Sequence, residues 1–270
     1  MSIKLIAMDL DGTLLNSQKV ITPRTFAALQ AAKERGIYVT IATGRMYMAA
    51  AYFGKMIGAQ VPVICCNGGL VRGDSTQPPI FVKCYEEAVA REVLTECYKN
   101  DWYAQWYIDT QIYAKDFRPD MFGSYRTVEG FNLNAVGEDF LPYTKDVIQI
   151  VIRDKDGGVA AITEKIRAKF VGLLDPQQNT DISVDLTPPG INKAVGLKAL
   201  LKHLNLSPDE VMACGDGDND LAMLEYAGFS VATGNAIEQA KQAANVVTDT
   251  CDQDGIGKAI ERYVLQNRNF

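Results

Sequence analysis

The chain has 270 residues, of which 47% are hydrophobic and 22% charged, so a packed core is available and wholesale disorder is excluded. Its formal net charge is −6 and it has no basic block, which argues against nucleic acid as a partner. It has no apolar run of membrane-spanning length and no signal-peptide pattern, so no membrane contact is expected.

The cysteines and the histidine narrow the chemistry further. Six cysteines without a C-x-x-C pair indicate buried thiols in a reducing cytoplasm rather than a disulfide framework. The single histidine, His203, falls near the end of a predicted helix, where a surface role is expected. A Ser-His-Asp triad or a multi-histidine zinc site would have to be built without histidines to spare. Catalysis in this chain is therefore expected to depend on carboxylates.

The first 70 residues alternate short apolar runs with helical patterns. Strands are predicted at Ile3–Met8, Ile37–Ala42 and Val63–Cys66. Between the first two, Thr22-Pro23 begins a helix as cap and first-turn proline, Phe26 and Leu29 face the core, and Gly36 ends the helix. Strands separated by helices predict parallel pairing with right-handed crossovers.

A different pattern occupies residues 84–187, which hold fourteen of the 24 aromatic residues. This density is typical of the core of an α+β domain, and the alternative is that a few of the rings wall a ligand pocket. Helices are predicted at Glu86–Asn100 and Val159–Phe170, and strands at Val147–Ile152 and Ile182–Leu186.

The α/β alternation returns after residue 190, where Asn192 is expected to cap a leucine-rich helix. The predicted elements that follow are the strand Val211–Cys214, the short helix Asp220–Ala227 and a final helix from Gly255 to Leu265. The segment 84–187 therefore interrupts one domain formed by residues 1–83 and 188–270. The predicted fold class is α/β, a Rossmann-like parallel sheet with an inserted α+β domain.

The first strand ends in the acidic motif Asp9-Leu10-Asp11-Gly12-Thr13. The carboxyl end of a parallel strand opens into the crevice where α/β proteins bind ligands. Asp9 and Asp11 are expected to reach that crevice from the strand end and from the following turn. Gly12 permits a close turn whose amides can cradle an anion. A simple turn after the strand is the alternative.

The next two strand ends carry polar groups as well. Thr43 and Gly44 precede a helix, a place where a hydroxyl suits a phosphate oxygen, although a helix cap would explain Thr43 equally well. The third strand ends in Asn67-Gly68-Gly69, which favours a hairpin turn, with Asn67 reaching the crevice.

The strand Val211–Cys214 ends in the segment Gly215–Asp220, which contains Asp216, Asp218, Asn219 and Asp220. Clustered acids repel one another unless a hard cation lies among them, and oxygen ligands suit Mg²⁺. Lys193 begins the preceding helix and can neutralise a phosphate, although an isolated lysine at this position is more often solvated.

Taken in order, these motifs resemble the haloacid dehalogenase superfamily, specifically Cof-type phosphatases with a type IIB cap. The resemblance runs from Asp9 to the last helix, and residues 84–187 lie where such proteins insert the cap. One departure is Ala194 after Lys193, where the family often has glycine. The resemblance implies a phosphatase that hydrolyses small phosphate monoesters, such as sugar phosphates or phosphorylated cofactors, through an aspartyl-phosphate.

The resemblance also implies a role for each residue. Asp9 is the nucleophile and Asp11 the general acid and base, and both catalytic residues join Asp216 in holding Mg²⁺, Asp11 through its backbone carbonyl. The phosphate-binding residues are Gly12, Thr43, Gly44, Lys193 and Asn219. Asp220 and Asn67 are supporting residues, and Asp218 is a solvated loop acid.

Three alternatives stay open. A phosphosugar mutase would use the same site but transfer the phosphoryl group to a second hydroxyl. A non-enzymatic phosphoacceptor or regulator of phosphorylated metabolites would not need Asp11 as an acid. A structural protein would not need so many converging carboxylates. The expected partner is a small phosphorylated metabolite, and the expected state is a cytoplasmic monomer or weak homodimer.

Overall fold

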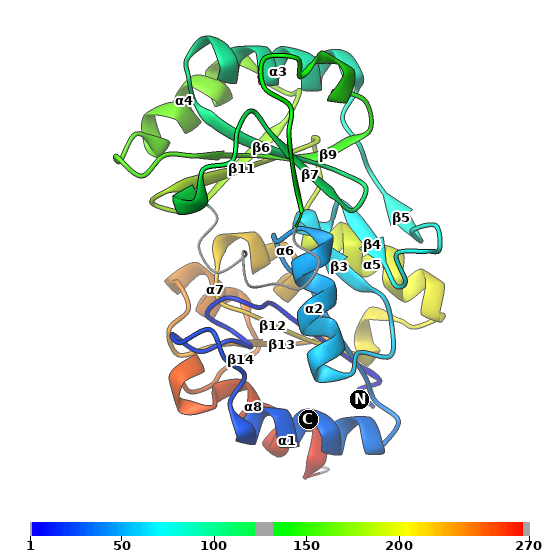
Figure 1. The fold of residues 1–270 in the computed structure, drawn as a ribbon. Helices are drawn as coiled ribbons and strands as arrows, with labels where there is room; N and C mark the ends of the chain where they lie inside the picture. Colours follow the sequence, from blue (N-terminus) through cyan, green and yellow to red (C-terminus); the bar gives the residue numbers. More distant parts are fainter. Residues whose placement is uncertain (1, 122–131, 267–270) are drawn as a thin grey trace.

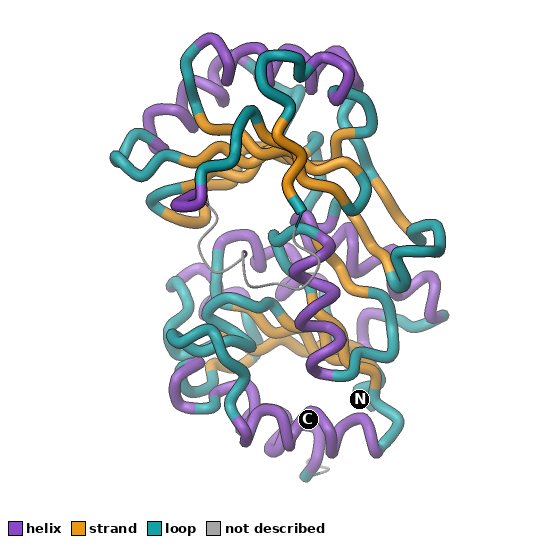
Figure 2. The backbone as a smooth tube through the Cα atoms, in the orientation of Figure 1, coloured by secondary structure: helices purple, strands orange, loops and turns teal. Residues whose placement is uncertain are grey.

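The computed structural model describes residues 2–121 and 132–266, which form two bodies stacked one above the other (Figure 1). Each body contains a large sheet with helices on its outside (Figure 2). The lower body holds the first and last parts of the chain, and the upper body holds the middle part. The aromatic-rich segment therefore forms a unit on top of the remainder.

The lower sheet has five parallel strands in the order β14-β13-β12-β1-β2. Its strands are β1 (Leu5–Met8), β2 (Tyr38–Ile41), β12 (Val211–Gly215), β13 (Phe229–Ala232) and β14 (Val246–Val247). Leu5 is paired with Tyr38 on one side and with Val211 on the other, so distant parts of the sequence meet in one sheet. This confirms the predicted parallel α/β core.

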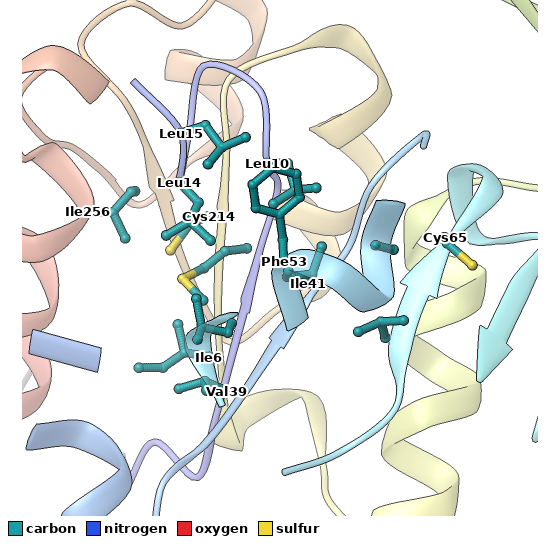
Figure 3. Packing of buried hydrophobic residues seen from close by; sticks show 14 of the residues in the cluster. Ile6, Leu10, Leu14, Leu15, Val39, Ile41, Phe53, Cys65, Cys214 and Ile256 are labelled. Carbon is teal, nitrogen blue, oxygen red and sulfur yellow. The ribbon is translucent and has the colours of Figure 1, made fainter. Parts of the chain in front are cut away.

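The two faces of the lower sheet carry separate apolar cores, because successive strand residues point to opposite sides. Ile6 packs on the face covered by α1 (Pro23–Glu34) and α8 (Gly255–Ile260), where Val39, Phe53 and Ile256 lie around it (Figure 3). Leu5 packs on the opposite face. The helices of that face are α5 (Lys193–Leu204), α6 (Leu221–Tyr226) and α7 (Glu238–Ala243). Burial on both faces fixes the strand ends that carry the acidic motifs.

The helix α1 begins as predicted, because the side chain of Thr22 accepts a hydrogen bond from the backbone N–H of Thr25 and Pro23 occupies the first turn. Leu29 is buried, but Phe26 is 39% exposed, so its predicted place in the core is wrong. The buried stripe runs through Thr25, Ala28, Leu29 and Ala32, and Phe26 is turned about 100° away from Thr25 around the helix axis.

The third predicted strand, β3 (Val63–Cys65), does not extend the parallel sheet beyond an isolated parallel bridge between Ala42 and Ile64. It forms a separate antiparallel sheet with β4 (Leu70–Arg72) and β5 (Phe81–Val82). The hairpin predicted at Asn67-Gly68-Gly69 is thereby confirmed. The helix α2 (Tyr47–Ile57) precedes this hairpin.

The upper sheet has six strands in the order β10-β11-β9-β6-β7-β8. Its strands are β6 (Tyr103–Ile108), β7 (Gln111–Ala114), β8 (Leu133–Ala135), β9 (Val147–Arg153), β10 (Asp175–Thr180) and β11 (Ser183–Thr187). The helices α3 (Glu87–Lys99) and α4 (Val159–Lys169) cover the face that is turned away from the lower body (Figure 1). The opposite face of the sheet is therefore turned towards the strand ends of the lower body.

All four elements predicted between 84 and 187 are present, as α3, α4, β9 and β11. Most of the described aromatic side chains lie in the core between the upper sheet and its helices, as Trp106 and Phe170 do. Three of the rings counted above, at 122, 125 and 131, lie outside the described residues. The chain crosses between the bodies before α3 and after β11, and we keep 1–83 with 188–270, and 84–187, as the proposed domain limits.

The remaining predictions concern the cysteines, the helix ends and the membrane. All six cysteines are free, four of them buried, whereas Cys84 and Cys251 are partly exposed. His203 is exposed in the last turn of α5, and α8 continues as a π-helical turn to Leu265. Within residues 2–121 and 132–266, no helix has the length and apolar character needed to cross a membrane.

Candidate active site

Three strand ends and one helix start meet above the carboxyl edge of the lower sheet. Asp9 follows β1, Thr43 follows β2, Asp216 follows β12, and Lys193 begins α5. The two aspartates and Thr43 line a cavity of about 620 Å³, and the upper sheet forms its opposite wall. Parallel strands deliver their carboxyl ends to a single edge, which explains why segments about 200 residues apart converge here.

Lys193 is fully buried and holds two carboxylates. Its Nζ donates to Asp9 Oδ1 and to Asp220 Oδ1, both at 2.6 Å. The alternative of a solvated helix lysine is therefore wrong. Asn192 caps the helix by accepting a hydrogen bond from Val195 N at 3.2 Å, and this fixes where the lysine side chain starts.

Asp9 is nearly buried beside that ammonium. Burial raises the pKa of Asp9 well above its usual value, and the Lys193 ammonium opposes the rise. The carboxylates of Asp220 and Asp216 raise the pKa further. Asp9 is thus a carboxylate whose negative charge is stabilised by one fixed cation and is still crowded by other acids.

Asp216 faces Asp9 from the neighbouring strand end. Burial raises the pKa of Asp216 to about 6, although the hydrogen bond that Thr13 Oγ1 donates to it at 2.6 Å lowers the pKa. The loop containing Gly12 passes so close that a Cβ at this position would lie 2.3 Å from Asp216 Oδ2. Gly12 has a φ of +80°, so both space and backbone conformation require glycine there.

Asp220 uses its oxygens within the fold. Its Oδ2 accepts hydrogen bonds from the backbone N–H groups of Asp216 and Gly217, both at 2.9 Å, while Oδ1 accepts from Lys193. Asp220 therefore fixes the turn that presents Asp216. Asp218, on the same turn, is exposed at the edge of the cavity.

Thr43 is buried and its Oγ1 accepts a hydrogen bond from Arg45 N at 3.2 Å. The cap position of the helix that follows is Met46, so the helix-cap explanation for Thr43 is wrong. Gly44 lies against Asn67, since a Cβ at Gly44 would come within 2.8 Å of Asn67 Oδ1.

Asp11 is held by two cations that were not among the predicted site residues. Arg45 donates to both of its carboxylate oxygens, at 2.7 and 2.6 Å, and Lys19 Nζ donates at 2.7 Å. Although burial raises the pKa of Asp11, these hydrogen bonds lower it to about 2. Arg45 immediately follows Thr43-Gly44, so the motif itself pointed to it, whereas no local pattern marks Lys19.

Asn67 connects the lower body with the upper one. Its Nδ2 donates to Asp185 Oδ2 at 2.8 Å, and its Oδ1 accepts from Asn219 Nδ2 at 2.9 Å. Asp185 belongs to β11 of the upper sheet, so this chain of bonds runs from the inserted segment to the acidic turn. A second link runs from Gln149 Nε2 to the carbonyl oxygen of Gly44 at 3.3 Å.

Comparison with known proteins identifies this arrangement. Residues 6–260 match the family model of haloacid dehalogenase-like hydrolases. The chain belongs to this family. It is 30% identical over 269 residues to the 5-amino-6-(5-phospho-D-ribitylamino)uracil phosphatase YitU of Bacillus subtilis, with 96% of this chain and 97% of the relative covered.

Solved structures agree with this assignment. A haloacid dehalogenase-like hydrolase from Bacteroides thetaiotaomicron is 28% identical, covers 97% of this chain and 99% of its own, and superposes with a TM-score of 0.86. A sugar phosphatase of subclass IIB shares the fold, with a TM-score of 0.82, 24% identity and coverage of 96% and 98%. The predicted family and phosphatase class are confirmed.

The acidic side chains of this haloacid dehalogenase-like hydrolase fit a divalent cation. One carboxylate oxygen from each of Asp9, Asp216 and Asp220 lies within 4.8 Å of the others. Since the oxygens of Asp220 already accept from Lys193 and two backbone amides, Asp9 and Asp216 are the better ligands. Burial, and after it the neighbouring carboxylates, raise the pKa of both groups, and oxygen ligands of this kind suit Mg²⁺.

Asn235 also contributes to the site of this hydrolase without a signal in the sequence. Its Nδ2 donates to the carbonyl oxygen of Gly12 at 2.8 Å, and Thr233 Oγ1 donates to the same oxygen at 3.2 Å. Both residues follow β13, so a further strand end supports the first motif. Among the described residues, Tyr107 is the one aromatic ring that lines the cavity. The alternative that aromatic rings of residues 84–187 wall a ligand pocket therefore holds for this one described ring.

Proposed function

We propose that this phosphatase hydrolyses small phosphate monoesters with Mg²⁺, through a phosphoryl group carried on Asp9. The observation that carries the proposal is the buried contact between Asp9 and Lys193 at the base of the cavity, opposite Asp216. The curated relative named above acts on a phosphorylated ribityl compound, which supports sugar phosphates and phosphorylated cofactors as the substrate class.

The reaction takes two steps on the same carboxylate. Asp9 Oδ attacks phosphorus, a bond forms between them, and the ester P–O bond breaks as the leaving oxygen takes a proton from Asp11. Water then attacks the phosphoryl group, gives its proton to Asp11 and releases Asp9 as a carboxylate. One proton moves out and one returns, so the second step restores Asp11 for the next cycle.

Asp11 must leave its present partners before it can act as an acid. A carboxyl group with a pKa of about 2 is ionised at neutral pH, and this value reflects the bonds from Arg45 and Lys19. A phosphate dianion entering the cavity competes for the same cations. We infer that substrate binding frees the Asp11 carboxylate and allows it to take up a proton.

The remaining site residues bind the phosphoryl group and the cation. Thr43, Lys193, Asn219 and the backbone at Gly12 and Gly44 are the proposed phosphate ligands, and Asp220 and Asn67 hold them in place. Mg²⁺, when bound by Asp9, Asp216 and the Asp11 carbonyl, offsets the repulsion between carboxylate and phosphate. The upper body closes the cavity and selects the leaving group, and a monomer or weak homodimer stays our prediction for the assembly.

Mg²⁺ affinity is expected to depend on pH through Asp216. Its pKa of about 6 without metal means that the cation must displace a proton below pH 6, so affinity falls about tenfold for each pH unit below that value. Calorimetric titration from pH 5 to pH 7.5 measures this slope. Asp216→Asn is expected to remove binding, and an affinity independent of pH would contradict the assignment.

Phosphate release from a panel of monoesters, with Mg²⁺ or with EDTA, tests the proposed reaction. We expect release that requires Mg²⁺ and a rank order among sugar phosphates. A mutase would instead return the phosphoryl group to a second hydroxyl, with no inorganic phosphate formed. Phosphorylated protein that accumulates without turnover would favour the regulator and overturn the hydrolase proposal.

A further inference from the structure

The cavity extends from the phosphate end along strand β9 of the upper sheet. At one end of this wall, Gln149 donates to the carbonyl oxygen of Gly44, beside Thr43. Val151 and Arg153 line the cavity further along. Alternate residues of a strand share a face, at about 3.3 Å for each residue. The backbone of Arg153 is thus about 13 Å along the strand from Gln149, at the far end of the wall.

Arg153 differs from the other cations of this cavity. Lys19 and Arg45 are paired with Asp11, and Lys155 is paired with Asp120 at 2.7 Å. The side chain of Arg153 makes no ion pair or hydrogen bond with the described residues 2–121 and 132–266, and its Nε is buried without a partner among them. A buried N–H group without an acceptor is unfavourable, so this guanidinium can bind an acceptor that the described part of the chain does not supply.

Hydroxyl and carboxylate groups line the wall next to Arg153. Ser183 is opposite Arg153 in the β9–β11 ladder, and its hydroxyl is 2.7 Å from that of Thr180. Asp185 is opposite Val151 and lines the same cavity. These groups suit a chain of hydroxyl-bearing carbons that connects the phosphate end with the guanidinium.

We propose that Arg153 binds an oxyanion, either a carboxylate or a second phosphate, at the end of the leaving group remote from the phosphate that Asp9 attacks. This inference rests on the proposed phosphatase function and narrows its substrates to phosphorylated polyhydroxy acids or bisphosphates. The planar guanidinium presents paired N–H donors that match two oxygens of a carboxylate or phosphate. A neutral polyol phosphate reaches the same wall but leaves Arg153 without its acceptor.

Matched substrates test the proposal. Glucitol 6-phosphate and 6-phosphogluconate differ only at C1, which is an alcohol in the first and a carboxylate in the second. We expect kcat/KM to be about 10- to 100-fold higher for the acid, mainly through KM, since a charge-assisted hydrogen bond of this kind contributes that much. Fructose 6-phosphate and fructose 1,6-bisphosphate form the corresponding pair for a second phosphate.

Two variants of Arg153 and one control variant test whether the preference for the acid depends on this side chain. Arg153→Gln is expected to bring the ratio between acid and alcohol close to one, and Arg153→Lys to retain part of it. Arg167→Gln, which alters an exposed arginine of α4 paired with Glu164, is expected to leave the ratio unchanged. Equal kcat/KM for both members of each pair in the unmodified protein, or a ratio that survives in Arg153→Gln, overturns the proposal.

Failure of this inference can be separated from failure of the phosphatase proposal. Para-nitrophenyl phosphate has no remote oxyanion, so its hydrolysis reports the reaction at Asp9 alone. If it is hydrolysed and the paired substrates show no difference, only the role of Arg153 is wrong. If no monoester is hydrolysed, calorimetric binding of 6-phosphogluconate and glucitol 6-phosphate to Asp9→Asn still measures the preference for the acid.

Discussion

Asp9→Asn is expected to lower Mg²⁺-dependent phosphate release by about 10⁴-fold or more, because removal of a nucleophile leaves only binding and electrostatic effects. The amide has nearly the same shape as the carboxylate but cannot attack phosphorus. It also removes one negative charge beside Lys193, whose Nζ lies 2.6 Å from Asp9 Oδ1. The measurement is kcat for the best monoester of the panel, with urea unfolding to show that the variant is folded.

Asp218→Asn is the matched control for this substitution. Asp218 belongs to the acidic turn and is exposed, and no role in binding or catalysis is assigned to it. The same chemical change there should leave kcat unchanged. If Asp9→Asn still releases phosphate at an appreciable rate with Mg²⁺, Asp9 is not the nucleophile. The reaction would then use another nucleophilic side chain or a direct attack of water on phosphorus.

The parts of the site that could be predicted are those in which neighbouring residues share a strand end. Asp9 and Asp11 lie two residues apart after β1, and Asp216 and Asp220 lie on one turn after β12. The parallel sheet then brings the two motifs together without further information, because its carboxyl ends share an edge. The positions of these side chains in the structure agree with the prediction, while their catalytic roles stay proposals.

Contacts between distant segments could not be predicted in this way. Asn67 and Asp185 are 118 residues apart, and their hydrogen bond depends on how the upper body sits over the lower one. Lys19 is in a loop with a φ of +60°, and nothing in its neighbours indicates that it reaches Asp11. Arg153 is the last residue of β9, one position beyond the predicted end of that strand at Ile152, and no motif around it indicates a place in the cavity.

Four strands of the upper sheet, β6, β7, β8 and β10, are not among the elements predicted from the sequence. The first five residues of β6 (Tyr103–Ile108) are all buried, because α3 covers one face and the lower body approaches the other, so the alternation of a half-buried strand is missing. β10 (Asp175–Thr180) is an edge strand of sequence DPQQNT, in which proline and polar residues have low strand propensity. The local composition therefore shows that the upper body is rich in aromatic residues, but it does not predict the order of the strands in its sheet.

Lys193→Met is expected to destabilise the protein by about 3–5 kcal/mol and to remove activity, since it leaves the buried carboxylates of Asp9 and Asp220 without their shared cation. Burial on its own would lower the pKa of Lys193, but the carboxylates of Asp220 and Asp9 raise it above its usual value, so the ammonium is charged at neutral pH. Methionine keeps the volume of the side chain and removes only the charge and its hydrogen bonds. Urea unfolding at pH 7 measures the loss.

The pH dependence of that loss distinguishes charge from packing. Lys193 lowers the pKa of Asp9, so without it Asp9 retains its proton to a higher pH, and the stability difference should shrink when the pH is lowered from about 7 to about 5. A packing defect would cost the same at both pH values. Lys198→Met, at an exposed position of the same helix, should change stability by no more than about 0.5 kcal/mol. A Lys193→Met variant as stable as the unmodified protein at pH 7 would mean that Asp9 and Asp220 find other partners, and the buried contact would no longer support Asp9 as a preorganised nucleophile.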